Sequence, residues 1–185
     1  MKKYMFFKKK KRESHILLIQ GSLNPRSKTA VLVDEAANIL KNRGVKYDII
    51  DLQKLDLEFC DGRPLADYSE TTRYVYKMVE EADGYIFGMP VYCYSISGAL
   101  KNFIDIMSDG MRKKTAGVLC HSGGLRSYLA SVDLIKILSY ESHVVSVQPI
   151  VHTYKESFKH EKIDDDAIVV LMNEMIDALL KYINV

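Results

Sequence analysis

The sequence predicts an α/β protein with a doubly wound, five-stranded parallel sheet in the order 2-1-3-4-5 and helices on both faces. Short apolar runs alternate along the chain with longer segments of helical periodicity, which is the pattern of successive βαβ units. The first run, residues 15–20, is almost entirely apolar, as expected for a strand buried on both faces. A chain of 185 residues with 48% hydrophobic content has room for one sizeable core but is short for two.

Each expected strand is followed by an expected helix. The strands are expected at residues 15–20, 47–52, 84–90, 115–121 and 143–151. The helices are expected at residues 28–43, 69–82, 97–107, 126–138 and 164–182. The third strand should end at Pro90, because proline cannot donate to a ladder. The first helix should end before Gly44, a typical C′ residue, and Tyr74 should face inward on the second helix.

Charge and hydropathy narrow the class of protein. Lys plus Arg number 26 against 24 Asp plus Glu, and the basic residues at positions 1–14 account for the excess, so the body carries no charge pattern for binding nucleic acid. We expect residues 1–14 to form a basic, disordered tail and residues 15–185 a single domain; a tail that contacts an anionic surface or a partner is the alternative. No apolar run approaches the roughly 18 residues of a membrane span.

Neither the cysteines nor the acidic residues form a metal motif. Cys60, Cys93 and Cys120 show no CxxC or Cys/His spacing, so neither a disulfide framework nor a zinc site is expected. A reducing compartment, the cytoplasm, fits this pattern. The run of three aspartates at residues 164–166 is interpreted as the acidic first turn of the last helix, and no metal is expected.

The loop after the first strand has the composition of a phosphate site. In a doubly wound sheet, ligands bind beyond the carboxyl ends of the strands, where a helix N-terminus offers free N–H groups and a positive dipole end. Because the loop is neither GxGxxG nor GxxxxGK[ST], a single terminal phosphate is expected rather than a dinucleotide or a triphosphate. The plainer alternative makes Ser27 or Thr29 an ordinary N-cap. The expected phosphate-binding residues are Ser22, Asn24, Arg26, Ser27, Lys28 and Thr29.

The loops after the third and fourth strands are suited to a flat heterocycle, which needs an apolar wall and several hydrogen-bond donors. Ser97 is expected to cap the next helix, and Gly98 to allow close backbone approach. Cys93 is interpreted as a small filler, with a redox role as the alternative, and His121 as either a ligand contact or a strand end without a role. The expected ring-binding residues are Pro90, Val91, Tyr92, Cys93, Tyr94, Ser95, His121, Ser122, Gly123 and Gly124.

These loops resemble the NADPH-dependent FMN reductase family, whose patterns are GSxRxxSxT after the first strand and PxYxxSxxGxLKNxxD after the third. The second pattern is matched at Pro90, Tyr92, Ser95, Gly98, Leu100, Lys101, Asn102 and Asp105. The first is matched at Gly21, Ser22, Ser27 and Thr29. Two departures stand out: Asn24 occupies a position where arginine is common, with Arg26 supplying the cation, and Ser127 replaces a glycine often found in the third loop.

The resemblance implies a flavodoxin-like fold with FMN as cofactor and NADPH or NADH as co-substrate. Hydride would pass from the nicotinamide to FMN and on to a small-molecule acceptor such as a flavin, a quinone or an azo compound, with no catalytic side chain because the flavin carries the chemistry. It also implies a homodimer or homotetramer, for which the tyrosine-containing segments 68–76 and 92–96 are candidates. The alternatives are a flavodoxin-type electron carrier, although the acidity and TxTGxT-like loop of that class are missing, and a non-catalytic interaction protein.

Overall fold

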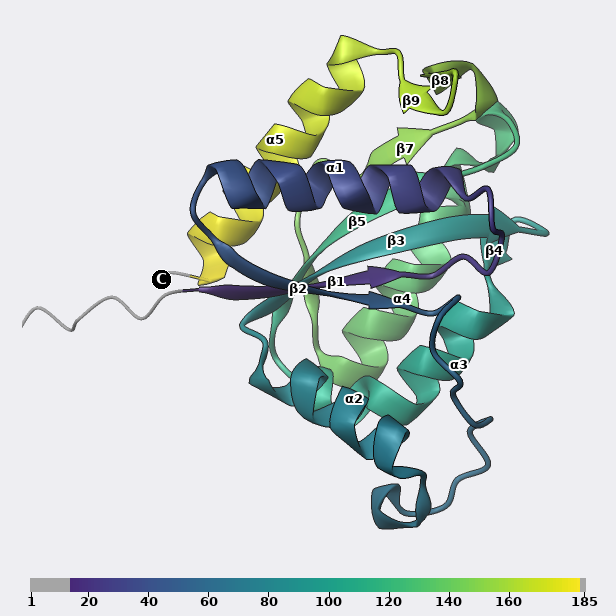
Figure 1. The fold of residues 1–185 in the computed structure, drawn as a ribbon, viewed down its shortest axis with the longest axis vertical. Coiled ribbons are helices and arrows are strands. Elements are labelled where there is room, and N and C mark those ends of the chain that lie inside the picture. Colours follow the sequence, from purple (N-terminus) through teal and green to yellow (C-terminus); the bar gives the residue numbers. More distant parts are fainter. Residues whose placement is uncertain (1–13, 184–185) are drawn as a thin grey trace, which may run out of the picture.

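The structure, a computed structural model, describes residues 14–183. The expected basic tail therefore lies outside the described residues, apart from Ser14. A central sheet is covered on one face by α1 (Lys28–Asn42) and α5 (Asp166–Ile183), and on the other by α2 (Glu70–Glu81), α3 (Gly98–Met107) and α4 (Ser131–Ser142) (Figure 1). Each face of the sheet carries its own buried apolar cluster, so the predicted two-sided arrangement is confirmed.

The main strands follow the predicted order. β1 (His15–Gln20) pairs in parallel with β2 (Lys46–Asp51) and β3 (Gly84–Tyr92), and β3 pairs in parallel with β5 (Thr115–His121). Beyond β5 the sheet is completed by β6 (Val145–Ser146) and β7 (Val151–Thr153), which both pair with it. The order 2-1-3-4-5 is confirmed when these two short strands are taken together as the fifth.

The prediction of one continuous strand over residues 143–151 is wrong. Residues 147–150 separate β6 from β7, and this segment contains Pro149, which has no N–H to donate to a ladder. β7 resumes the pairing at Leu119↔Val151 and carries it to His121↔Thr153, beyond the expected end of the strand. The strand therefore delivers His152 and Thr153 to the carboxyl edge of the sheet.

Two other boundaries and the facing of one side chain differ from expectation. β3 does not end at Pro90, because Val91 and Tyr92 change partner and pair antiparallel with β4 (Ser95–Ile96). The expected helix at 126–138 is a 3₁₀ helix, η3 (Leu125–Ala130), followed by α4. On α2, Tyr74 is exposed and the adjacent Val75 is buried in its place.

Short elements complete the chain. A small antiparallel hairpin, β8 (Phe158–Lys159) with β9 (Lys162–Ile163), lies beyond the end of β7 on the side of the sheet covered by α1 and α5 (Figure 1). The remaining 3₁₀ turns are η1 (Leu65–Asp67), η2 (Ser108–Met111) and η4 (Lys155–Ser157). Within residues 14–183, no helix combines the length and the apolar character needed to cross a bilayer.

Two glycines let α1 approach the sheet where β1 and β3 meet. The Gly21 N–H donates to the Gly88 carbonyl at 2.9 Å, and a Cβ built on Gly21 would lie 2.7 Å from that oxygen. A Cβ built on Gly88 would lie 2.5 Å from Cγ2 of Val33 and 2.9 Å from Cγ2 of Thr29, both on α1. A side chain at Gly88 would push α1 away from β3, and one at Gly21 would push the loop before α1 away from β3 and from Leu100 on α3.

We expect Gly88→Ala to lower the free energy of unfolding by about 1 to 3 kcal/mol, because the added methyl overpacks the contact between α1 and β3. Urea denaturation followed by circular dichroism measures the change. Gly98→Ala is the matched control, since no protein atom lies within 4 Å of a Cβ built there. Equal stability of the two variants would contradict this account of the packing.

Candidate functional site

The loop between β1 and α1 is shaped by its own polar side chains. The buried Gln20 amide donates to the Ser22 carbonyl at 2.8 Å and to Oδ1 of Asp51 at 2.9 Å, while the Ser22 N–H donates back to Oε1 of Gln20. Asn24 uses its Oδ1 to accept the Arg26 N–H at 2.9 Å and gives its own N–H to Oγ of Ser22 at 3.2 Å. Asn24 is therefore a residue that forms the turn, and its amide nitrogen remains a donor.

The N-terminus of α1 begins at a capped residue. Ser27 Oγ accepts the Ala30 N–H at 3.1 Å, so the N-cap interpretation is confirmed for Ser27. Capping uses a lone pair of the hydroxyl and leaves its hydrogen to donate elsewhere. Thr29 is buried beneath the helix against Gly88, whereas the side chains of Arg26 and Lys28 reach solvent. N–H groups in the first turn have no intrahelical acceptor and thus favour an anion.

The turn between β3 and β4 adopts a costly backbone conformation. Tyr92 pairs with Ser95, so Cys93 and Tyr94 form a two-residue hairpin loop, and their φ angles are 50° and 61°. Positive φ at both loop positions is the geometry of type I′ turns, which strongly favour Asn-Gly. Neither residue is of that type, and Tyr92, Cys93 and Tyr94 are all exposed. Strain of this kind is typical of functional sites.

Ser95 is linked to α4, a helix that no sequence pattern connects with it. Its hydroxyl donates to Oδ2 of Asp133 on α4 at 2.7 Å, and this hydrogen bond, followed by the ion pair with Lys136, holds the pKa of Asp133 below its usual range. The hydroxyl hydrogen of Ser95 is thereby committed to Asp133. Ser97 caps α3 as expected, by accepting the Leu100 N–H, and its own hydroxyl donates to the Gly21 carbonyl at 2.8 Å. The loop between β1 and α1 is therefore joined directly to the start of α3.

Two histidines at the carboxyl edge of the sheet, His121 at the end of β5 and His152 on β7, have ring protons that can be assigned from their partners. Thr153 gives its hydroxyl hydrogen to the Cys120 carbonyl at 3.1 Å, so His121 Nδ1 must donate to the threonine oxygen, 3.1 Å away. The His121 Nε2 is then an acceptor in the neutral ring. In the same way, Ser122 donates to the Gly124 carbonyl at 2.8 Å, so His152 Nε2 donates to the serine oxygen at 3.1 Å.

Burial keeps both imidazoles neutral. Burial, and after it the nearby His152 and Lys28, lower the pKa of His121 to about 4. Burial alone lowers the pKa of His152. At neutral pH His121 consequently holds one proton at Nδ1, and it is not a source of positive charge.

A pocket of about 600 Å³ opens where the second loop, between β3 and α3, meets the third loop, which follows β5. Its size is in the range of ordinary cofactor sites. No protein atom lies within 4 Å of a Cβ built on Gly123 or Gly124, so the space beside this backbone is free. The loop before α1 is not part of the lining. The pocket is lined by Val91, Cys93, Tyr94, Gly123, Gly124, Leu125, Arg126 and Ser127.

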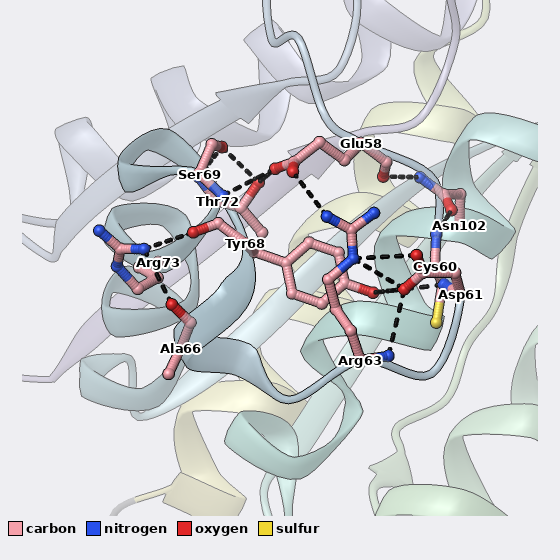
Figure 2. Close-up of polar contacts among 10 residues, drawn as sticks. All are labelled: Glu58, Cys60, Asp61, Arg63, Ala66, Tyr68, Ser69, Thr72, Arg73 and Asn102. Atoms are coloured by element: carbon pink, nitrogen blue, oxygen red, sulfur yellow. Dashed lines mark hydrogen bonds and ion pairs between the residues drawn. The ribbon is translucent and has the colours of Figure 1, made fainter.

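Part of the motif after the third strand has a structural role (Figure 2). Asn102 on α3 donates its amide to the Glu58 carbonyl at 2.9 Å and accepts the Cys60 N–H at 2.8 Å, so one side chain holds the β2–α2 loop at two points. Glu58 accepts the Ser69 N–H at 2.9 Å, where Ser69 caps α2. Lys101 pairs with Asp105 on the surface of the same helix.

The same loop contains an aromatic and ionic contact. Arg63 binds Asp61 through Nε, at 2.8 and 3.0 Å, and its guanidinium lies 4.7 Å from the ring centre of Tyr68. Tyr68 is buried, so this part of the segment 68–76 is not available as an oligomer contact. Gly98 has no protein neighbour that requires a glycine. None of the residues of this loop network lines the pocket formed by the second and third loops.

Of the ten expected ring-binding residues, Val91, Cys93, Tyr94, Gly123 and Gly124 line this ring pocket, whereas Pro90, Tyr92, Ser95, His121 and Ser122 are not part of its lining. The expected phosphate-binding residues lie apart from the pocket, in the loop before α1 and in the first turn of that helix. Cys93 lies at the ring pocket, Cys120 is a core residue with its pKa raised to about 12 by burial, and the three cysteines, all within the described residues, form no disulfide. Sequence reasoning missed Asp133, His152, Thr153 and Phe158. The sequence would have pointed to His152 and Thr153 only if the last strand had been predicted to continue beyond residue 151.

A doubly wound parallel sheet with helices on both faces, in which a capped helix follows the first strand, defines a protein of the flavodoxin-like class. The sequence profile of the NADPH-dependent FMN reductase family matches residues 14–156. A NAD(P)H-dependent FAD/FMN reductase of Geobacillus thermodenitrificans is 33% identical over 82% of this chain and 84% of its own. An FMN-dependent NADPH-azoreductase of Staphylococcus saprophyticus is 26% identical over 80% of each chain. A solved NADH:FMN oxidoreductase, in its apo form, superposes with a TM-score of 0.75 at 25% identity over 91% and 89%.

The chain belongs to the NADPH-dependent FMN reductase family. It is an oxidoreductase that uses FMN together with NADPH or NADH. The residues present suit that cofactor. The donors at the start of α1 match a phosphate, and the unobstructed backbone at Gly123 and Gly124 suits the edge of a flat ring.

The double variant Cys93→Asn with Tyr94→Gly should be more stable than the wild type by about 1 to 2 kcal/mol. The introduced asparagine and glycine favour the left-handed region that both positions occupy, whereas cysteine and tyrosine do not. It should bind FMN more weakly, since two side chains that line the pocket change. Urea denaturation and fluorescence titration measure the two effects. Lys113→Asn, at a φ of 61° outside the site, should gain stability without loss of FMN affinity. A double variant no more stable than the wild type would refute the strain at this turn.

Proposed function

We propose that this protein reduces a small planar acceptor with electrons from NADPH or NADH, using FMN held with its phosphate at the start of α1 and its ring in the pocket between the second and third loops. The observation that carries this proposal is the pocket of about 600 Å³ at Gly123 and Gly124, at the same carboxyl edge of the sheet as the capped N-terminus of α1. When bound, FMN supplies the redox chemistry, accepting hydride from the nicotinamide and passing electrons to the acceptor.

The phosphate end of the site works through donors. Ser22 and Ser27 accept backbone N–H groups through their oxygens, which leaves both hydroxyl hydrogens for a phosphate. The first-turn amides of α1 and the guanidinium of Arg26 add to them, and charge-assisted contacts of this kind are the strongest available to a phosphate. The residues that would hold the phosphate are Ser22, Asn24, Arg26, Ser27, Lys28 and the backbone of Thr29.

The ring end of the site works mainly through shape and backbone. The hydroxyls of Ser95 and Ser122 already donate to Asp133 and to the Gly124 carbonyl. Donors to a ring therefore come from main-chain N–H groups of the loops and from the side chains of Arg126 and Ser127, which line the pocket. The neutral His121 offers an acceptor at Nε2. Tyr92 and Tyr94 extend into solvent beside the pocket, where they can flank a second planar molecule.

The pocket is walled by two loops and open to solvent, and an open face explains how acceptors of different shape are accommodated. The names of relatives include quinone and azo reductases, which is consistent with a broad range of acceptors. We place this activity in the cytoplasm, because three unpaired cysteines, two of them exposed, suit a reducing compartment. We also infer that residues 15–185 act as one FMN-binding domain.

Arg26→Ala should weaken FMN binding by about 1.5 to 3 kcal/mol and leave riboflavin binding nearly unchanged, because only FMN carries the phosphate that the guanidinium contacts. Quenching of flavin fluorescence gives both dissociation constants. Lys41→Ala, which removes a cation at the opposite end of α1, serves as the control. An equal loss for the two flavins would place Arg26 outside the phosphate site.

Anaerobic addition of NADPH to the FMN-loaded protein should bleach the visible absorbance of the oxidised flavin, with NADH tested in parallel. The spectrum should recover when a quinone is added, because the open pocket admits a second planar molecule. A flavin that stays oxidised with both nucleotides would support an electron carrier instead. A protein that takes up no FMN at all would support the non-catalytic alternative.

We further propose that the chain forms a homodimer or homotetramer through the apolar surface around the pocket. Residues of the β3–β4 turn, η3 and the start of α4 expose large apolar side chains, and contiguous patches of this kind mark protein interfaces. In the segment 92–96 both tyrosines belong to this surface, whereas in the segment 68–76 Tyr74 is exposed and Tyr68 is buried. The surface comprises Tyr92, Tyr94, Leu125, Tyr128, Leu129 and Val132.

Leu129→Glu should shift the protein to a smaller sedimentation coefficient, because a charge inside an apolar interface is not compensated. Sedimentation velocity compares it with the wild type. Val170→Glu, an equally exposed position on α5, should sediment like the wild type. A wild type that sediments as a monomer at every concentration would rule out the oligomer.

A further inference from the structure

The β8–β9 hairpin places one aromatic ring between the two halves of the site. Phe158 on β8 is half-buried against the cluster beneath α1 and α5. Its ring centre lies 5.2 Å from that of His121 at an interplanar angle of 87°, so the two rings meet edge to face. The ammonium of Lys28 lies 5.5 Å from the centre of the same ring. A residue outside the main sheet therefore touches the first residue of α1 and the last residue of β5.

Each of these contacts restrains a group of the site. A cation held against an aromatic face is attracted by the ring quadrupole, which limits the conformations of a long lysine side chain. Edge-to-face packing fixes the plane of an imidazole, and Thr153 fixes its rotation from the other side by accepting from Nδ1. Lys28 is thereby held at the first residue of α1, next to the phosphate loop, and His121 at the carboxyl end of β5.

We propose that Phe158 is a positioning residue of the cofactor site, which holds the Lys28 ammonium for the FMN phosphate and shields the His121 ring so that its Nε2 stays an acceptor. The inference rests on the proposed function, because it assigns Lys28 and His121 to the FMN site. Phe158 itself is not expected to contact the flavin. Its effect on FMN acts through Lys28, and its effect on the ring pocket acts through His121.

The charges around His121 are compatible with this role. The titratable groups that face it are Lys28 from α1 and His152 from β7, while Thr153 and Phe158 are uncharged. Both Lys28 and His152 disfavour a proton on His121, as does burial. Removal of the Phe158 ring exposes the imidazole to water, and its pKa should then move from about 4 toward the ordinary value of about 6.5.

The decisive variant is Phe158→Leu, which keeps an apolar side chain and removes the aromatic face, compared with Phe158→Tyr, which keeps the ring. In ligand-free protein, an NMR titration of the His121 imidazole should show a higher pKa in Phe158→Leu and an unchanged one in Phe158→Tyr. At pH 8, where an imidazole with a pKa at or below about 6.5 is neutral, Phe158→Leu should also weaken FMN without weakening riboflavin, because only the contact to Lys28 is lost. The expected loss is about two- to fivefold, the range for an exposed cation–π contact. Phe59→Leu, an exposed phenylalanine in the β2–α2 loop, is the matched control and should change neither.

The same measurements in a Lys28→Met background separate positioning from general stability. If Phe158 acts through Lys28, Phe158→Leu should have no further effect on FMN once the ammonium is absent. The proposal is overturned if the His121 titration is identical in Phe158→Leu and in the wild type, or if Phe158→Leu still weakens FMN in the Lys28→Met background. If the wild type binds no FMN, the proposed function fails, and the ligand-free titration still decides whether Phe158 shields His121.

Discussion

The close approach of α1 to β3 is the constraint on which the candidate site depends. Gly88 allows Val33 and Thr29 to pack directly on the strand, and Gly21 lets the loop before α1 pass within hydrogen-bond distance of the same strand. The N-terminus of α1 consequently lies over the carboxyl ends of β1 and β3. Ser97 then joins the start of α3 to the Gly21 carbonyl, so two helix N-termini are anchored at one point of the sheet.

A hydroxyl has one hydrogen to donate, and the way these hydrogens are used divides the site into two chemical halves. In the loop before α1, Ser22 and Ser27 act as acceptors toward backbone N–H groups and keep their hydrogens. On β4, after β5 and on β7, the hydroxyls of Ser95, Ser122 and Thr153 have already donated theirs to protein oxygens. The first arrangement suits a phosphate, which only accepts, and the second leaves recognition of a ring to backbone, shape and the Arg126 and Ser127 side chains that line the pocket.

Much of this architecture follows from local sequence, because strands, caps and loops are encoded by neighbouring residues. The strands, the cap at Ser27 and the position of the three loops follow from apolar periodicity and turn-forming residues, and the strand order follows from the doubly wound class that the strand–helix alternation indicates. The contacts that finish the site join residues far apart in the chain, such as Ser95 with Asp133, His121 with Thr153 and Phe158 with Lys28. Their pairing depends on the register of β7 and on the hairpin after it, and neither is encoded by a local pattern.

The apolar surface and the ring pocket share residues, and this links two of the proposed properties. Tyr94 and Leu125 line the pocket and are also among the most exposed apolar side chains around it. A second copy of the chain seated on this surface would cover part of the pocket mouth and replace solvent as one wall. The range of acceptors would then depend on the assembly as well as on the loops. The turn at Cys93 and Tyr94, with positive φ at both residues, lies at this shared edge, where both side chains are exposed and line the pocket.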